Sequence, residues 1–226
     1  MSAPWSRPGL ALVAGAALVL SGCGVLSQAG DRNLPSVPVA TQDAASAGSD
    51  RPTAPKGSRW VIATHSGIQL VGPSTWKTVD WAATVKNADR AELAALAKSM
   101  NYTVAEVTAE SKNMDLLLMA PSGSSAGSNI SVVLKPSAGL PSTPALAKAL
   151  TAHKSTVTRT WSVKTAVGHG VAMTYRVALS GKALYGESVF LKTDKGFVTI
   201  DVTCLSAAAV QKIAKPLLSS LRRANL

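Results

Sequence analysis

The sequence is poor in the residues that build disulfide frameworks and stacking surfaces. It has 2 cysteines, Cys23 and Cys204, and aromatic residues make up 4% of its 226 positions. Because Cys23 belongs to an N-terminal motif described below, Cys204 stands alone and an intrachain disulfide is excluded. The net charge of +11 could attract nucleic acid. However, the basic residues are spread singly apart from Arg222 and Arg223, and the aromatic residues are too few to stack on bases, so we expect no nucleic-acid partner.

Groups for acid–base catalysis and metal binding are also scarce. The chain has 12 acidic residues and 3 histidines, namely His65, His153 and His169. No two histidines have the i, i+3 or i, i+4 spacing of a metal site. The Ser/Gly-rich stretch 122–128 is not followed by the lysine of a phosphate-binding loop, and it predicts a hairpin loop. We therefore expect no metal, no cofactor and no enzymatic activity.

An apolar run that ends at a cysteine marks the N-terminus. Residues 10–20 are uncharged and apolar, Arg7 precedes them, and the tetrapeptide LSGC follows at 20–23. This length and these small residues are typical of a secretory signal peptide, and the cysteine directly after them resembles a bacterial lipobox. The resemblance implies cleavage after Gly22, lipidation of Cys23 and attachment to the outer face of the plasma membrane. Two alternatives are an uncleaved membrane helix, which needs about 20 apolar residues, and a plain secretory signal, which has no need of the cysteine.

The sequence divides into three parts. Residues 1–22 are the expected lipoprotein signal peptide, and residues 23–58 are the expected lipidated cysteine with a Pro/Ser/Ala tether. The tether shows no helical or strand periodicity, so it cannot bury enough surface to fold, and we expect it to be disordered. Residues 59–226 are long enough for one folded domain.

The order of helix and strand patterns in the domain predicts an α+β fold with helices on the faces of a mainly antiparallel sheet. Capping-box patterns at Asp89 and Thr103 each begin a helix, and Pro216 is expected to kink or split the last one. The expected strands are 60–64, 67–71, 114–120, 130–135, 170–179, 184–193 and 197–205, and the expected helices are 89–101, 103–112, 144–154 and 206–221.

A few side chains of the domain are candidates for contact with a partner or ligand. Trp76, Trp81 and Trp161 are either core residues or, where exposed, partner contacts, because interface hot spots favour tryptophan. Met173 and Tyr175 lie on one face of a predicted strand and could line an apolar cavity. Cys204 ends an alternating strand pattern and is expected to be a small buried hydrophobic residue.

The order of these motifs resembles a known family. A strand that leads into Pro73-x-x-Trp76, a later strand that begins Gly170-Val171-Ala172, and a closing helix that ends near Leu221 resemble the PsbP-like fold. Together with the lipobox and the tether, the chain resembles the LpqN/LpqT-type surface lipoproteins of mycobacteria and related actinobacteria. The resemblance implies an α/β/α sandwich and a non-enzymatic role in envelope lipid biogenesis and its transporters. It brings no catalytic residues with it.

Two functional hypotheses follow, and an enzyme is the least favoured third. The first is a cell-envelope binding or adaptor module that docks on a membrane transporter or an envelope enzyme. The second is a lipid or glycolipid carrier with an internal apolar pocket.

Overall fold

The computed structural model describes residues 52–99, 102–121, 128–136, 139–179, 182–224. The expected signal peptide, Cys23 and most of the tether lie outside these residues, so lipidation and the tether remain predictions. Among the residues described, no helix has both the length and the apolar character needed to cross a bilayer.

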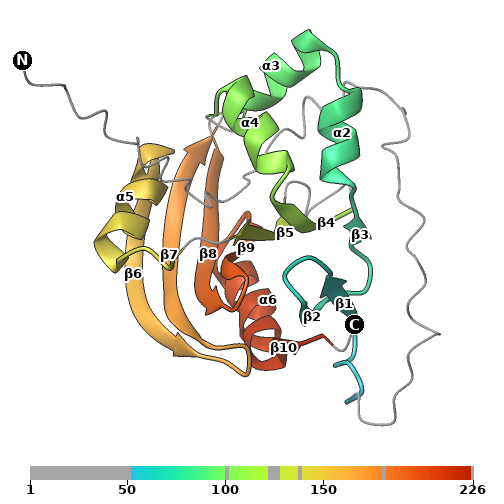
Figure 1. The fold of residues 1–226 in the computed structure, drawn as a ribbon, viewed down its shortest axis with the longest axis vertical. Helices are drawn as coiled ribbons and strands as arrows, with labels where there is room; N and C mark the ends of the chain where they lie inside the picture. Colours follow the sequence, from blue (N-terminus) through green and yellow to red (C-terminus); the bar gives the residue numbers. More distant parts are fainter. Residues whose placement is uncertain (1–51, 100–101, 122–127, 137–138, 180–181, 225–226) are drawn as a thin grey trace, which may run out of the picture.

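In the described ranges, seven antiparallel strands form the main sheet, in the order β3-β4-β5-β9-β8-β7-β6 (Figure 1). The chain therefore makes a continuous meander from β6 to β9, after which β9 pairs with β5 in the centre. The strands are β3 (Lys77–Thr78), β4 (Met114–Met119), β5 (Asn129–Pro136), β6 (Ser155–Lys164), β7 (His169–Leu179), β8 (Lys182–Thr193) and β9 (Gly196–Cys204).

A small second sheet and the C-terminal helix cover one face of the main sheet. The small sheet consists of β1 (Ser58–Ala63), β2 (Ile68–Pro73) and β10 (Arg222–Arg223). The helix α6 (Ala207–Ser220) packs against β2, β8 and β9. Side chains from β1, β2, α6 and the main sheet form the largest core cluster. It includes Val198, Ile200, Val202 and Cys204, as the alternation along β9 predicts.

Helices cover the opposite face in two groups. The helix α5 (Thr143–Ala152) packs over the meander, where Leu146 and Leu150 belong to one buried cluster with Met173, Tyr175 and Phe190. The helices α2 (Trp81–Asn87), α3 (Arg90–Ser99) and α4 (Val104–Ser111) pack over Leu117 at the other end. Helices therefore flank both faces of a mainly antiparallel sheet, which confirms the expected fold class.

Local signals in the sequence place several boundaries correctly. At Thr103 the side chain accepts a hydrogen bond from the Glu106 amide and the Glu106 carboxylate accepts one from the Thr103 amide, which is the capping box that the sequence predicts. Asp89 and Glu92 exchange the same pair of bonds, at 2.8 and 3.0 Å. Ser206 caps α6 as expected, with its hydroxyl accepting from the Ala209 amide.

Four elements were not expected, and the expected split at Pro216 is wrong. The strands β3, β6 and β10 and the helix α2 are the unexpected elements. The helix α2 has an N-cap in Asp80, whose carboxylate accepts from the Ala83 amide at 2.8 Å. Pro216 lies inside α6, yet the helix continues to Ser220 and is not split. The proline removes one backbone bond, whereas Ala214 and Leu217 on either side of it remain buried.

Candidate functional site

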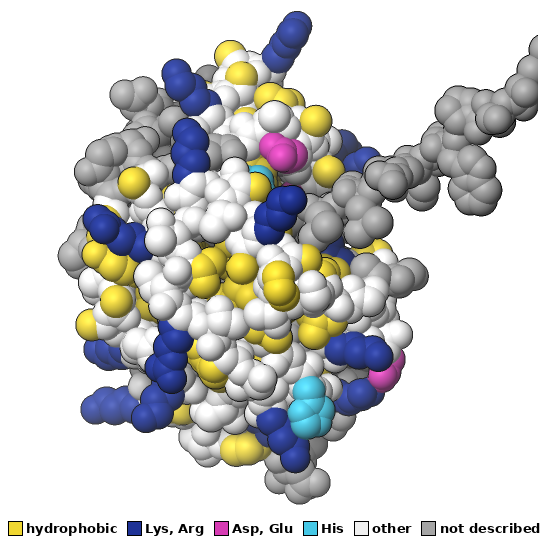
Figure 2. All heavy atoms as spheres, turned by 90° about the vertical axis from the view of Figure 1, so that its left-hand side faces the viewer, with side chains coloured by type: hydrophobic (Ala, Val, Ile, Leu, Met, Phe, Trp, Pro, Cys, Tyr) yellow, Lys and Arg dark blue, Asp and Glu magenta, His cyan; other side chains and the backbone are white. Residues whose placement is uncertain are grey.

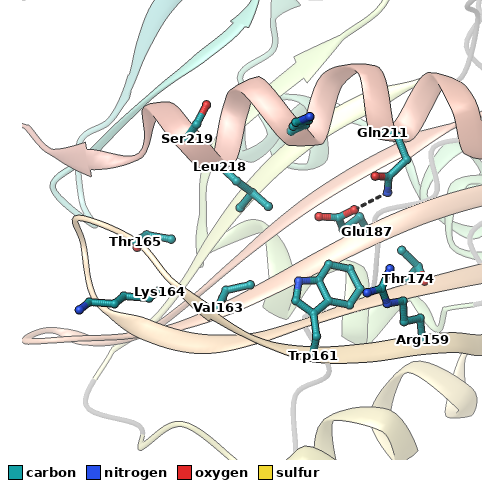
Figure 3. A pocket seen from close by; sticks show the side chains of 11 residues that line it. Arg159, Trp161, Val163, Lys164, Thr165, Thr174, Glu187, Gln211, Leu218 and Ser219 are labelled. Carbon is teal, nitrogen blue, oxygen red and sulfur yellow. Dashed lines mark hydrogen bonds between the residues drawn. The ribbon is translucent and has the colours of Figure 1, made fainter.

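An open groove of about 620 Å³ lies between α6 and the outer strands of the meander (Figure 3). Because α6 packs over β8 and β9, it leaves part of the same face of β6 and β7 open. Paired residues of neighbouring strands form the groove floor, with Arg159 beside Thr174 and Thr174 beside Glu187. The lining residues are Arg159, Trp161, Val163, Lys164, Thr165, Thr174, Glu187, Gln211, Lys215, Leu218 and Ser219.

Trp161 is the only one of the three candidate tryptophans that lines this groove. Its ring is partly buried against the main core cluster, and the Arg159 guanidinium carbon lies 5.1 Å from the ring centroid, which is a cation–π distance. Trp76 and Trp81 are 7% and 3% exposed and fill the core. They therefore present no surface to a partner, and of the three only Trp161 stays a contact candidate.

The groove has cations at its rim and one acid in its floor. Arg159, Lys164 and Lys215 are exposed, whereas Glu187 is 3% exposed. Burial raises the pKa of Glu187, while the hydrogen bond that Gln211 donates at 2.8 Å and the nearby charge of Arg159 oppose that rise. Glu187 therefore has protein partners, and the three exposed cations remain available to a ligand or partner of negative charge.

The side of the molecule that bears α5 and β6 resembles the groove in having basic side chains around apolar ones (Figure 2). Lys and Arg side chains lie around a central hydrophobic area on this side, and acidic side chains are sparse. Partly buried hydrophobic residues that belong to this region and pack against the second core cluster are Leu140, Ala147, Val157 and Val171. The excess positive charge of the sequence is thus visible beside the edge of the sheet.

A row of polar residues lies inside the protein on the opposite face of the sheet. Ser131 and Ser188 are the cross-strand neighbours of Asp201, and all three are at most 1% exposed. Ser188 donates a hydrogen bond to the Asp201 carboxyl. Burial raises the pKa of Asp201 to about 8, and the charge of Glu110 adds to the rise, so this carboxyl is mainly protonated at neutral pH.

A buried ion pair ties α4 to this row. Lys135 Nζ on β5 lies 2.5 Å from Glu110 Oε2 on α4, and both side chains are less than a tenth exposed. Burial raises the pKa of Glu110, and the positive charge and hydrogen bond of Lys135 act against that rise. We interpret the row and the pair as the polar interior that positions α4 on the sheet.

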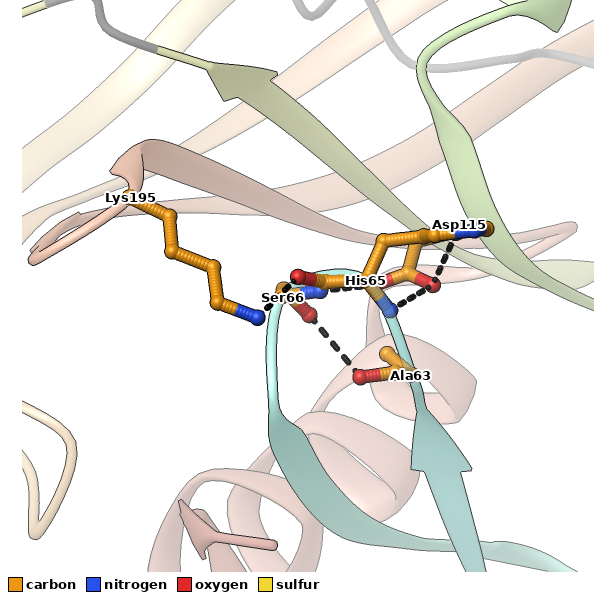
Figure 4. Close-up of polar contacts among 5 residues, drawn as sticks. All are labelled: Ala63, His65, Ser66, Asp115 and Lys195. Atoms are coloured by element: carbon orange, nitrogen blue, oxygen red, sulfur yellow. Dashed lines mark hydrogen bonds and ion pairs between the residues drawn. The ribbon is translucent and has the colours of Figure 1, made fainter. Parts of the chain in front are cut away.

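His65 and Ser66, in the turn between β1 and β2, come together with Asp115 of β4, but not as a catalytic triad (Figure 4). Asp115 accepts from the His65 and Ser66 amides at 2.9 and 2.6 Å, and its Oδ1 lies 3.1 Å from His65 Nδ1. The Ser66 hydroxyl donates instead to the Ala63 carbonyl, so it is not bonded to the histidine. Lys195 Nζ donates to the His65 carbonyl at 2.7 Å. The cluster therefore fastens the turn to β4 and to the β8–β9 turn.

The sequence contains two short matches to serine-nucleophile motifs, although we expect no enzymatic activity. Residues 74–77 have the S-x-x-K spacing, but the Ser74 hydroxyl donates to the Gly57 carbonyl at 3.1 Å, and Lys77 is exposed on β3. Residues 123–127 have the G-x-S-x-G spacing and lie outside the described residues. They connect β4 to β5, whereas a nucleophile elbow connects a strand to a helix.

The other residues considered as candidates, namely two histidines, Cys204, Met173 and Tyr175, do not form a binding or catalytic site in the described residues. His153 stacks on Tyr102 with ring centroids 4.4 Å apart, and His169 is exposed at the start of β7. Cys204 is 1% exposed, and burial raises the pKa of its thiol, as suits an unreactive core residue. Within the described ranges, no three His, Cys, Asp or Glu residues gather as metal ligands. Met173 and Tyr175 are at most 1% exposed in the packed cluster under α5.

Comparisons with known proteins extend this description only at the level of fold. No family model and no curated protein matches the chain. The fold is similar to the solution structure of cyanobacterial PsbP (CyanoP) from Synechocystis sp. PCC 6803, with 12% identity and a TM-score of 0.47 over 80% of this chain and 99% of that one. It is also similar to a crystal structure from Bacteroides thetaiotaomicron VPI-5482, with 8% identity and a TM-score of 0.37 over 74% and 48%. At these scores neither similarity carries a conclusion about activity or partners.

Proposed function

We propose that this chain is a cell-envelope lipoprotein whose domain is a non-enzymatic binding and adaptor module. In this proposal Cys23 carries the lipid, residues 24–57 hold the domain away from the outer face of the plasma membrane, and the groove beside Trp161 docks on a membrane transporter or an envelope enzyme. The resemblance to the LpqN/LpqT-type lipoproteins supports a role in envelope lipid biogenesis or transport.

The groove is the observation on which the adaptor role depends. A large aromatic side chain that is only partly buried, with an exposed cation stacked on it, is the type of residue that anchors protein interfaces. Trp161 and Arg159 provide this combination on the outermost strand of the sheet. A partner could reach this position without any change in the core.

The lipid anchor is tested by removing the thiol. In cells that make the chain, Cys23→Ala should abolish labelling with radioactive palmitate and release the protein from the membrane fraction. Cys204→Ala is the matched control, because Cys204 is buried in the domain and should leave labelling unchanged. If the Cys23 variant labels and sediments like the parent chain, the lipoprotein assignment is wrong.

The adaptor role is tested by crosslinking from the groove. A photoreactive benzoylphenylalanine at Ser219, which is exposed on the groove wall, should form adducts with a membrane or envelope protein. The same group at the exposed Lys98 on α3 is the control. Trp161→Ala should reduce the adducts from Ser219. Equal adducts from both positions, or none from Ser219, would contradict the adaptor role.

The second candidate function is that of a lipid or glycolipid carrier, and the size of the groove supports it. A volume of about 620 Å³ falls within the range of small-molecule sites, and Trp161, Val163 and Leu218 give it apolar walls. Native mass spectrometry of the purified protein separates the two roles, because a carrier should retain a co-purified lipid and an adaptor should not. In the crosslinking experiment, a carrier should give an adduct with the mass of a lipid.

A further inference from the structure

The main sheet ends in one long strand and one short one. Within the part of the chain that the structure describes, the strand β6 is 10 residues long and pairs only with β7, whereas the opposite edge is β3, which has 2 residues. A long edge strand presents a row of backbone donors and acceptors that another strand can bond to, and a short edge does not. Figure 1 places β6 at the outside of the sheet.

The regular part of this edge is the second half of β6. The pairing with β7 shifts between Val157 and Arg159, where the Thr158 hydroxyl bonds to Thr174. From Arg159 to Lys164 the register is continuous. A bulge twists a strand and ends regular pairing, so the surface suited to strand addition is Arg159–Lys164.

The charges along this edge discriminate between partners. Arg159 and Lys164 are exposed at its two ends, and Lys215 faces the same groove from α6. A second copy of this chain would bring like charges together and be repelled. An acidic segment would be attracted, and this attraction is the charge complementarity that sets specificity at interfaces.

We propose that the partner contributes an extended acidic segment that adds as a strand to Arg159–Lys164. This inference rests on the proposed adaptor function and names the chemistry of its partner. Backbone bonds to β6 hold the segment, and every second side chain lies next to Arg159, Trp161 or Val163 on the groove face, because strand side chains alternate between faces. Acidic side chains there meet Arg159 and Lys215, and the Trp161 ring packs against the segment.

Hydrogen–deuterium exchange of the full chain tests strand addition directly. The probe is a synthetic peptide of alternating glutamate and valine, long enough to span Arg159–Lys164, and the control peptide has lysine in place of glutamate. The glutamate peptide should slow exchange in β6 and leave β9, a central strand, unchanged. The lysine peptide should have no effect. Equal protection by both peptides, or none by the glutamate peptide, overturns the proposal.

Matched variants separate charge selection from a general effect on folding. Arg159→Glu with Lys164→Glu should lose the protection, whereas Lys56→Glu with Lys98→Glu, which changes the net charge equally at exposed sites elsewhere, should keep it. Thermal unfolding of each variant checks that it is folded. Slow exchange of the β6 amides that point away from β7, in the chain without peptide, would mean that the edge is already covered, and this result also overturns the proposal.

The outcomes distinguish this inference from the adaptor function. If the groove crosslinks to a partner protein but the acidic peptide leaves β6 exchange unchanged, docking stands and strand addition is wrong. If the peptide protects β6 but no partner crosslinks from Ser219, the edge binds acidic strands and the adaptor function lacks its partner.

Discussion

The Ser188 hydroxyl donates a hydrogen bond to the Asp201 carboxyl between two central strands, where both residues are at most 1% exposed. The bond favours the ionised form of Asp201, but burial acts more strongly in the other direction and raises its pKa to about 8. The folded state therefore holds a proton that the unfolded state has released at neutral pH. Folding is thus coupled to proton binding at this residue.

The stability of the protein should depend on pH through Asp201. Because the folded pKa of about 8 exceeds the ordinary value of 3.8 for an aspartate, this carboxyl contributes fully to stability below about 3.8, and its contribution falls as pH rises until it levels off above about 8. Urea unfolding across this range should show the decline in the parent chain. Asp201→Asn cannot ionise and should show a weaker decline, and the exposed Asp194→Asn is the control. Parallel curves for the parent and Asp201→Asn would contradict the pKa shift.

Removing only one partner of the ion pair between Glu110 and Lys135 should destabilise the protein more than removing both. Lys135→Met removes the cation and leaves the Glu110 carboxylate buried without it, which should lower the free energy of unfolding by about 3–5 kcal/mol. Lys135→Met combined with Glu110→Leu removes both charges and should recover most of that loss. Chemical unfolding of the single and double variants measures the difference. If the double variant is as unstable as the single one, the lost free energy of unfolding comes from the loss of the ion pair itself and not from the unpaired charge of Glu110.

A close approach between neighbouring strands predicts a third effect. Tyr175 pairs with Gly186, and a Cβ atom built on Gly186 would lie 2.0 Å from Tyr175 Cζ. Gly186→Ala should therefore destabilise the fold by about 1–3 kcal/mol or more. In a Tyr175→Leu background, which lacks the ring atoms, the same substitution should cost much less. A double-mutant cycle of unfolding free energies gives the coupling, and additive effects would show that the ring moves aside.

The parts of the fold that local signals encode were predictable from the sequence. The capping boxes at Asp89 and Thr103 and the alternation in β9 depend on near neighbours in the chain. The strand β6 was not expected although Val157, Trp161 and Val163 follow a period of two in the sequence, because Arg159 interrupts that apolar alternation. In the fold, the bulge near Thr158 places Val157 and Trp161 on opposite faces of the sheet. A mainly exposed edge also has no continuous apolar side to signal a strand.

The groove was not predictable, since it depends on which strands α6 leaves uncovered. Trp161 was identified as one of three candidates, but residue type alone could not separate it from Trp76 and Trp81, which fill the core. Glu187 and Gln211 are 24 positions apart and meet only in the folded chain. A glycine in the middle of a strand, such as Gly186, is a signal in the sequence that could have indicated a close approach, here that of the Tyr175 ring.

Trp161 and Trp81 should respond differently to truncation. Trp81 is 3% exposed in the cluster beneath α2, so Trp81→Ala should cost about 3–5 kcal/mol of unfolding free energy. Trp161 is only partly buried at the edge of the sheet and leaves one side open to the groove, so Trp161→Ala should cost clearly less. Chemical unfolding of the two variants, with the parent chain beside them, measures both losses. If Trp161→Ala is as destabilising as Trp81→Ala, Trp161 is a core residue. Reduced crosslinking from Ser219 in the Trp161→Ala variant would then not show the loss of a partner contact. A small loss of stability, together with reduced crosslinking from Ser219, would instead assign Trp161 to binding.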